Sequence, residues 1–113
     1  MLEDAIDIAV DHQNTMDAME STIDAVREEM DKAVRKFPTW PTDPLHALAV
    51  LGEEYGELNK AMLQLMYEPH KEGTSPQHVK TEAIQTAAMS LRLAMSLDRY
   101  QYGPGEQHKQ SAR

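Results

Sequence analysis

The chain has 113 residues, 41% of them hydrophobic, which predicts a single domain with a small core. Its 11 Lys and Arg against 19 Asp and Glu residues give a net charge of −8, the opposite of the basic surface that nucleic-acid binding requires. The absence of cysteine excludes disulfides and thiolate metal sites, and no apolar run is long enough for a membrane span. Because the amino-terminal residues also lack the features of a signal peptide, we expect a cytoplasmic protein.

The first predicted element is a long helix over residues 1–37. Pro38 limits it, because a residue that precedes proline disfavours the α conformation. Apolar residues at alternating spacings of three and four lie on one stripe of this helix: Met16, Met19, Ile23, Val26, Met30, Ala33 and Phe37. The stripe faces either the other helices of the chain or a partner chain.

Two further helices are predicted over residues 44–66 and 76–100. Each begins with a capping residue that is followed directly by proline, and these caps are Asp43 and Ser75. The polar loop between the two helices is short, so the helices can pack as antiparallel neighbours.

Strand patterns are nearly absent, so the predicted fold is all-α, with one domain over residues 1–102 and a flexible tail over 103–113. Three helices in so small a chain leave at least one apolar stripe without cover. We therefore expect a homodimer or homotetramer, in which a helical bundle is completed by oligomerisation.

The most informative segment places Glu53, Glu54 and Glu57 within five residues of the second predicted helix. Residues three and four apart project from adjoining parts of one helix side, where like charges repel. A bound magnesium ion, which prefers oxygen ligands, would offset this repulsion. A solvated acidic face explains these three residues equally well.

Glu82 favours the metal interpretation. It lies in an apolar stretch of the third predicted helix, where a carboxylate needs a partner or an exposed position. In an antiparallel pair of helices Glu82 can lie opposite Glu54 and Glu57, with Gln85 beside it. Helix-borne carboxylates that converge inside a bundle form a metal site.

The pattern Glu53-Glu54-x-x-Glu57, followed after a spacer by Glu82, resembles the motif of the MazG-like all-α nucleotide pyrophosphohydrolases. In that family a Glu-Glu-x-x-Glu helix and a Glu-x-x-Asp helix together hold magnesium. Gln85 stands where the family has Asp, and its carbonyl oxygen can bind a metal but brings no charge.

The resemblance implies a four-helix MazG-like core and hydrolysis of a (deoxy)nucleoside triphosphate to the monophosphate and pyrophosphate, with Mg²⁺ or Mn²⁺ as cofactor. Glu54, Glu57, Glu82 and Gln85 are then the expected metal ligands. Glu53 is the candidate catalytic residue, as a general base for water or as a group that supports the ligands.

Trp40 and Lys60 are candidate substrate-binding residues. Trp40 can stack on a nucleotide base or anchor its loop to the core. Lys60, one turn after the acidic motif, can meet a phosphate or remain a solvated lysine. Two other functions are compatible with the sequence: a degenerate relative that binds nucleotide without turnover, and a non-catalytic helical interaction protein.

Overall fold

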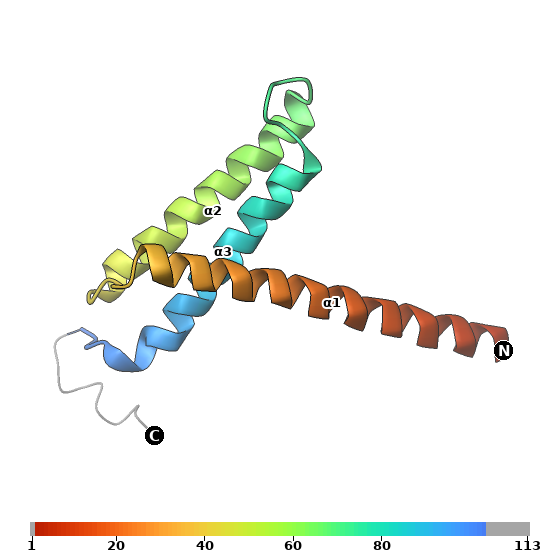
Figure 1. The fold of residues 1–113 in the computed structure, drawn as a ribbon, viewed down its shortest axis with the longest axis horizontal. Helices are drawn as coiled ribbons and strands as arrows, with labels where there is room; N and C mark the ends of the chain where they lie inside the picture. The colour runs from red at the N-terminus through yellow and green to blue at the C-terminus, as the bar shows by residue number, and fades with distance from the viewer. Residues whose placement is uncertain (1, 104–113) are drawn as a thin grey trace.

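The computed structural model describes residues 2–103, which form an all-helical chain (Figure 1). The elements in chain order are α1 (Leu2–Lys36), α2 (Pro44–Tyr67), α3 (Pro76–Ser96) and a short 3-10 helix, η1 (Leu97–Arg99). Within these residues there is no strand, so the all-α prediction is confirmed. Apart from Gly103, the predicted tail lies outside the described residues.

The predicted caps start the second and third helices. The Asp43 carboxylate accepts a hydrogen bond from the N–H of Leu45 at 2.9 Å, and the Ser75 hydroxyl accepts one from the N–H of His78 at 3.0 Å. Each bond satisfies a backbone donor that the first helical turn leaves without a partner. The positions of α2 and α3 along the chain therefore follow from local sequence.

The α-helical part of α3 ends at Ser96, four residues earlier than the expected end at residue 100. After η1, Tyr100 is extended, and its hydroxyl donates to the carbonyl oxygen of Pro41 at 3.0 Å. The helical conformation therefore ends before Tyr100, which contacts the α1–α2 loop. This contact joins residues far apart in the sequence, so helical periodicity does not predict it.

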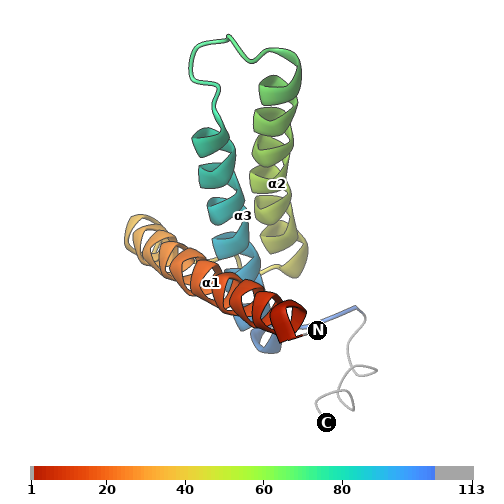
Figure 2. The ribbon, with the colours of Figure 1, turned by 90° about the vertical axis from the view of Figure 1, so that its right-hand side faces the viewer.

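α2 and α3 form an antiparallel hairpin, and α1 crosses α3 and projects well beyond it (Figures 1 and 2). α3 is the central element, because it packs against both other helices. The buried apolar residues in the described chain are few and small: Ala47, Ala61, Val79 and Ala88. No large side chain is fully buried there, so the core of one chain is thin.

Much apolar surface is left uncovered. On α1, Val26, Met30 and Ala33 are half-buried near the crossing with α3, whereas the described side chains before Met16 are exposed. On α2, one outward face carries exposed residues at helical spacing: Leu45, Leu48, Tyr55, Met62 and Met66. Within residues 2–103, no helix has the length and apolar character needed to cross a membrane.

Candidate functional site

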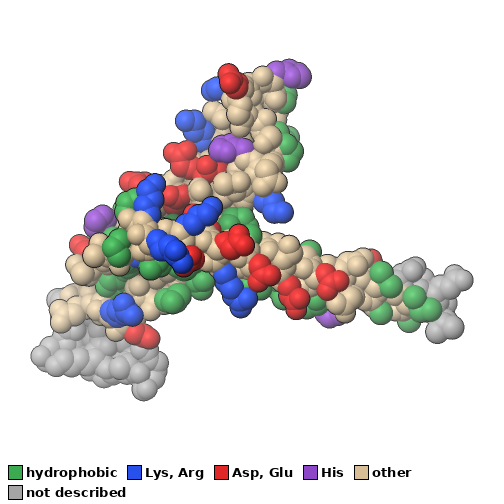
Figure 3. Space-filling model, in the orientation of Figure 1, with side chains coloured by type: hydrophobic (Ala, Val, Ile, Leu, Met, Phe, Trp, Pro, Cys, Tyr) green, Lys and Arg blue, Asp and Glu red, His purple; other side chains and the backbone are tan. Residues whose placement is uncertain are grey.

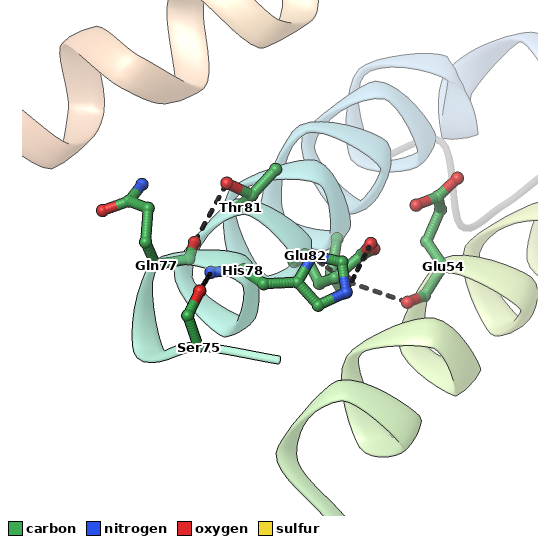
Figure 4. A network of polar contacts seen from close by, with 7 residues as sticks. Glu54, Ser75, Gln77, His78, Thr81 and Glu82 are labelled. Carbon is green, nitrogen blue, oxygen red and sulfur yellow. Dashed lines mark hydrogen bonds and ion pairs between the residues drawn. The ribbon is translucent and has the colours of Figure 1, made fainter. Parts of the chain in front are cut away.

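Glu54 lies in the contact between α2 and α3. It follows Ala47 by seven residues and precedes Ala61 by seven, and both alanines are buried, so the helical repeat places Glu54 on the same face. The Thr86 hydroxyl lies 3.2 Å from the carbonyl oxygen of Glu54 and 2.8 Å from that of Glu82. The two glutamates therefore come from facing helices, as predicted (Figure 4).

The pKa of Glu54 is raised above its ordinary value. Partial burial is the largest cause, and the charges of Glu82, Glu57, Glu29 and Glu53 follow in that order. Both causes disfavour the ionised carboxylate. Every charge that shifts this pKa is negative, and the four carboxylates come from three helices. We call Glu54 and these four residues the acidic centre.

Glu82 is largely enclosed, because its side chain is only 13% exposed. Its carboxylate lies 3.9 Å from Nε2 of His78, one turn earlier on α3 (Figure 4). That distance is at the limit of an ion pair, and the imidazole is charged only when protonated. His78 is therefore a weak and conditional partner for Glu82.

A pocket of about 590 Å³ lies next to the acidic centre, between the carboxyl-terminal part of α1, the α1–α2 loop and the α2–α3 hairpin. Four of the predicted site residues line it, namely Trp40, Glu53, Glu54 and Gln85. Glu57 and Glu82 do not line the pocket, although their charges raise the pKa of Glu54. Lys60 lies apart, on a shallow groove of α2.

Arg92 of α3 lines the pocket and contacts the α1–α2 loop. Its guanidinium is buried, donates to the carbonyl oxygen of Phe37 at 2.7 Å and stacks 4.8 Å from the centre of the Trp40 ring. A charged hydrogen bond and a cation–π contact together fix the α1–α2 loop against α3. The ring of Trp40 is therefore held in place as part of the pocket wall.

The α1 residues of the pocket are not among the site residues predicted from the sequence. Glu29, Lys32 and Lys36 all line it. Their spacing of three and four places them on one face of α1, beside Ala33 of the apolar stripe. A polar face at the carboxyl-terminal end of that stripe is the pattern that would have indicated them.

The donors of the acidic centre fit a hard divalent cation, since all of them are carboxylate oxygens. Among the side chains that the structure describes, however, no three His, Asp or Glu groups are close enough together to hold a metal ion. Glutamate has three side-chain torsions, so rotamer changes on facing helices can alter these distances. Metal binding by Glu54, Glu57, Glu82 and Gln85 stays a prediction.

Comparisons with protein-family models, with curated proteins and with solved structures found no match to this chain. The resemblance to the MazG-like motif thus rests on Glu53, Glu54, Glu57 and Glu82.

Replacing Glu54 with glutamine is expected to stabilise the metal-free protein at neutral pH. A raised carboxyl pKa contributes stability that is present below the ordinary value of 4.5 and is lost as pH rises through the pKa of the folded state. As pH rises above that ordinary value, burial and the neighbouring charges increasingly disfavour the ionised Glu54 carboxylate, and glutamine has no charge to disfavour.

The measurement is thermal unfolding in a chelator between pH 5 and 8. We expect the melting temperature of Glu54→Gln to exceed that of wild type by a margin that shrinks toward pH 5. Glu28→Gln, an exposed glutamate of α1 that is not in the acidic centre, is the matched control and should shift the melting temperature little. A lower melting temperature for Glu54→Gln at pH 7 would contradict this account.

Proposed function

We propose that this chain is a divalent-metal-dependent nucleotide pyrophosphohydrolase, which converts a (deoxy)nucleoside triphosphate to the monophosphate and pyrophosphate. The observation that carries the proposal is the position of Glu54. This carboxylate lies in a helix–helix contact, has its pKa raised by the charges of four other carboxylates and borders an open pocket. A divalent cation would offset this concentration of negative charge and would bring a phosphate chain to the pocket.

The proposed metal ligands are Glu54 and Glu82 on the facing helices, with Glu57 one turn further along α2. Gln85 lines the pocket beside Glu54 and would add a neutral carbonyl oxygen. When bound, the metal ion supplies charge shielding for the phosphates and lowers the pKa of a bound water. The three glutamates would orient that ion with respect to the pocket.

Glu53 is the proposed general base. It is exposed and lines the pocket, so water can reach its carboxylate. In the proposed reaction, a water oxygen bonds to the α-phosphorus as Glu53 accepts the water proton. The bond between that phosphorus and the bridging oxygen breaks, and its electron pair leaves with pyrophosphate.

The pocket volume of about 590 Å³ suits a nucleotide-sized ligand. Trp40 lines this pocket, which supports its proposed role in binding substrate. Lys60 receives no such support, because it lies on a different groove. Free nucleotides as substrates and a chain without cysteine are in keeping with a cytoplasmic location, which we also propose.

We also propose that the chain is a homodimer or homotetramer in which a second copy completes a four-helix core. The thin core and the outward apolar face of α2 support this proposal. Gly52 and Gly56 lie within that face, one turn apart, and a Cβ atom added at either would meet nothing within 4 Å. Glycine inside a helix costs about 0.5–1 kcal/mol relative to alanine. The cost is explained if a second helix packs closely there.

The first test is turnover. With Mg²⁺ or Mn²⁺, the pure protein should release pyrophosphate and monophosphate from at least one common dNTP. Glu54→Gln and Glu82→Gln should each lower kcat/KM by about 100-fold or more, because misplacing the metal misplaces the reacting phosphate. Glu28→Gln should retain wild-type activity. Chromatography of the nucleotide products measures the activity of the wild type and the three variants.

Product analysis and binding together distinguish the pyrophosphohydrolase from the two alternative functions. Orthophosphate in place of pyrophosphate would contradict attack at the α-phosphorus. Metal-dependent binding without turnover would favour the degenerate nucleotide-binding protein, and Gln85→Asp should then tighten metal binding by restoring a charge. Neither binding nor turnover would favour the helical interaction protein.

The second test is self-association, measured by sedimentation velocity. We expect the wild type to sediment as a dimer or tetramer and Leu48→Asp to dissociate it, because a charge buried in an interface is costly. Thr81→Asp, which adds the same charge at an exposed position on α3, is the control. Gly52→Ala should weaken association. A monomeric wild type that Gly52→Ala stabilises would show that the α2 face is free.

A further inference from the structure

We propose that Lys32 and Lys36 of α1 bind the phosphate chain of the nucleotide, so that the α1 side of the pocket forms a phosphate-binding wall. The inference rests on the proposed function and adds to it the residues that recognise the charged part of the substrate.

Both lysines line the pocket from α1, while Glu53, Glu54 and Gln85 line it from the α2–α3 hairpin. Residues four apart lie on the same side of a helix, so the two ammonium groups share one face. Figure 3 shows basic side chains gathered where α1 crosses the hairpin, whereas acidic side chains follow the middle of α1. The pocket is therefore bordered by charges of both signs, since Glu29 of α1 lines it together with the two lysines.

These lysines are available to a ligand. Lys32 makes no hydrogen bond or ion pair in the part of the chain that the structure describes. The ammonium of Lys36 lies 5.4 Å from the centre of the neighbouring Phe37 ring and has no carboxylate partner among the described residues. Arg35, between them in sequence, differs because its guanidinium pairs with Asp31 at 3.0 Å.

Among the described residues, Arg92 is the one other cation that lines the pocket, and its role is different. Its charge is directed to the Phe37 carbonyl oxygen and the Trp40 ring. Arg92 is therefore a positioning residue for the loop, and the contacts to phosphate are left to the two lysines.

Charge balance explains why such a wall is needed. The chain has a net charge of −8, and the pocket borders the acidic centre, so a free triphosphate is repelled on approach. A divalent cation offsets only part of that repulsion. Two exposed ammonium groups add local positive charge on a flexible stem, which suits the several oxygens of a phosphate chain.

Binding can be followed with Trp40, the only tryptophan of the chain, which lines the same pocket. The probes are an α,β-imido nucleoside triphosphate, inorganic tripolyphosphate and the corresponding nucleoside, each with Mg²⁺. For both phosphate probes, Lys32→Ala and Lys36→Ala should raise Kd about tenfold or more, as expected for the loss of a charge-assisted hydrogen bond. Arginine at either position should restore most of the affinity.

Two controls make the result specific. Arg35→Ala removes a cation that does not line the pocket and should leave every Kd unchanged. The Kd for the nucleoside should be the same in the lysine variants as in the wild type. The rise in melting temperature that metal causes without nucleotide should also be the same.

Wild-type affinity for both phosphate probes in Lys32→Ala and Lys36→Ala would overturn the inference. If Glu54→Gln then still abolished turnover, the proposed function would stand without this phosphate wall. If the wild type bound neither phosphate probe, the phosphate-wall inference and the proposed function would both be overturned. Loss of affinity for the nucleotide probe alone would show that the lysines contact the nucleoside, which also contradicts the inference.

Discussion

The close contact between α2 and α3 is the constraint on which the rest of the structure depends. Three of the four buried apolar residues in the described chain are alanines, Ala47 and Ala61 on α2 and Ala88 on α3. Alanine leaves little between two helix backbones and loses no rotamer freedom on burial. The backbones are close enough for the Thr86 hydroxyl of α3 to reach the carbonyl oxygen of Glu54 at 3.2 Å.

That contact determines where negative charge gathers. Because Glu54 is seven residues from each buried alanine of α2, packing the alanines against α3 carries this carboxylate into the same contact. An apolar side chain at position 54 would reduce the free-energy cost of folding. Burial and the charges of four other carboxylates all disfavour the ionised form of Glu54. Departures of this kind from local consistency are expected at functional sites. α1 then closes the pocket over the same region and contributes charges of both signs.

Local sequence predicts the α2–α3 hairpin and the site residues that it carries, but not those of α1. Asp43 and Ser75 mark where α2 and α3 begin, and a short loop makes them antiparallel, which places Glu82 opposite Glu54. The position of α1 depends instead on where it crosses α3, and the apolar stripe of α1 does not specify that point. Contacts between distant segments, such as Arg92 with the Phe37 carbonyl oxygen, therefore have no local pattern. For the same reason the sequence shows a polar face on α1 at Glu29, Lys32 and Lys36, but only the folded chain shows that this face lines the pocket.

The central claim is that Glu54, Glu57 and Glu82 bind one divalent cation between α2 and α3. The most direct measurement is anomalous X-ray scattering from crystals grown with manganese. We predict one strong peak beside Glu54, with carboxylate oxygens from both helices about 2–2.5 Å from the ion. Manganese found only elsewhere on the protein, or carboxylates that remain free at saturating manganese, would contradict the account.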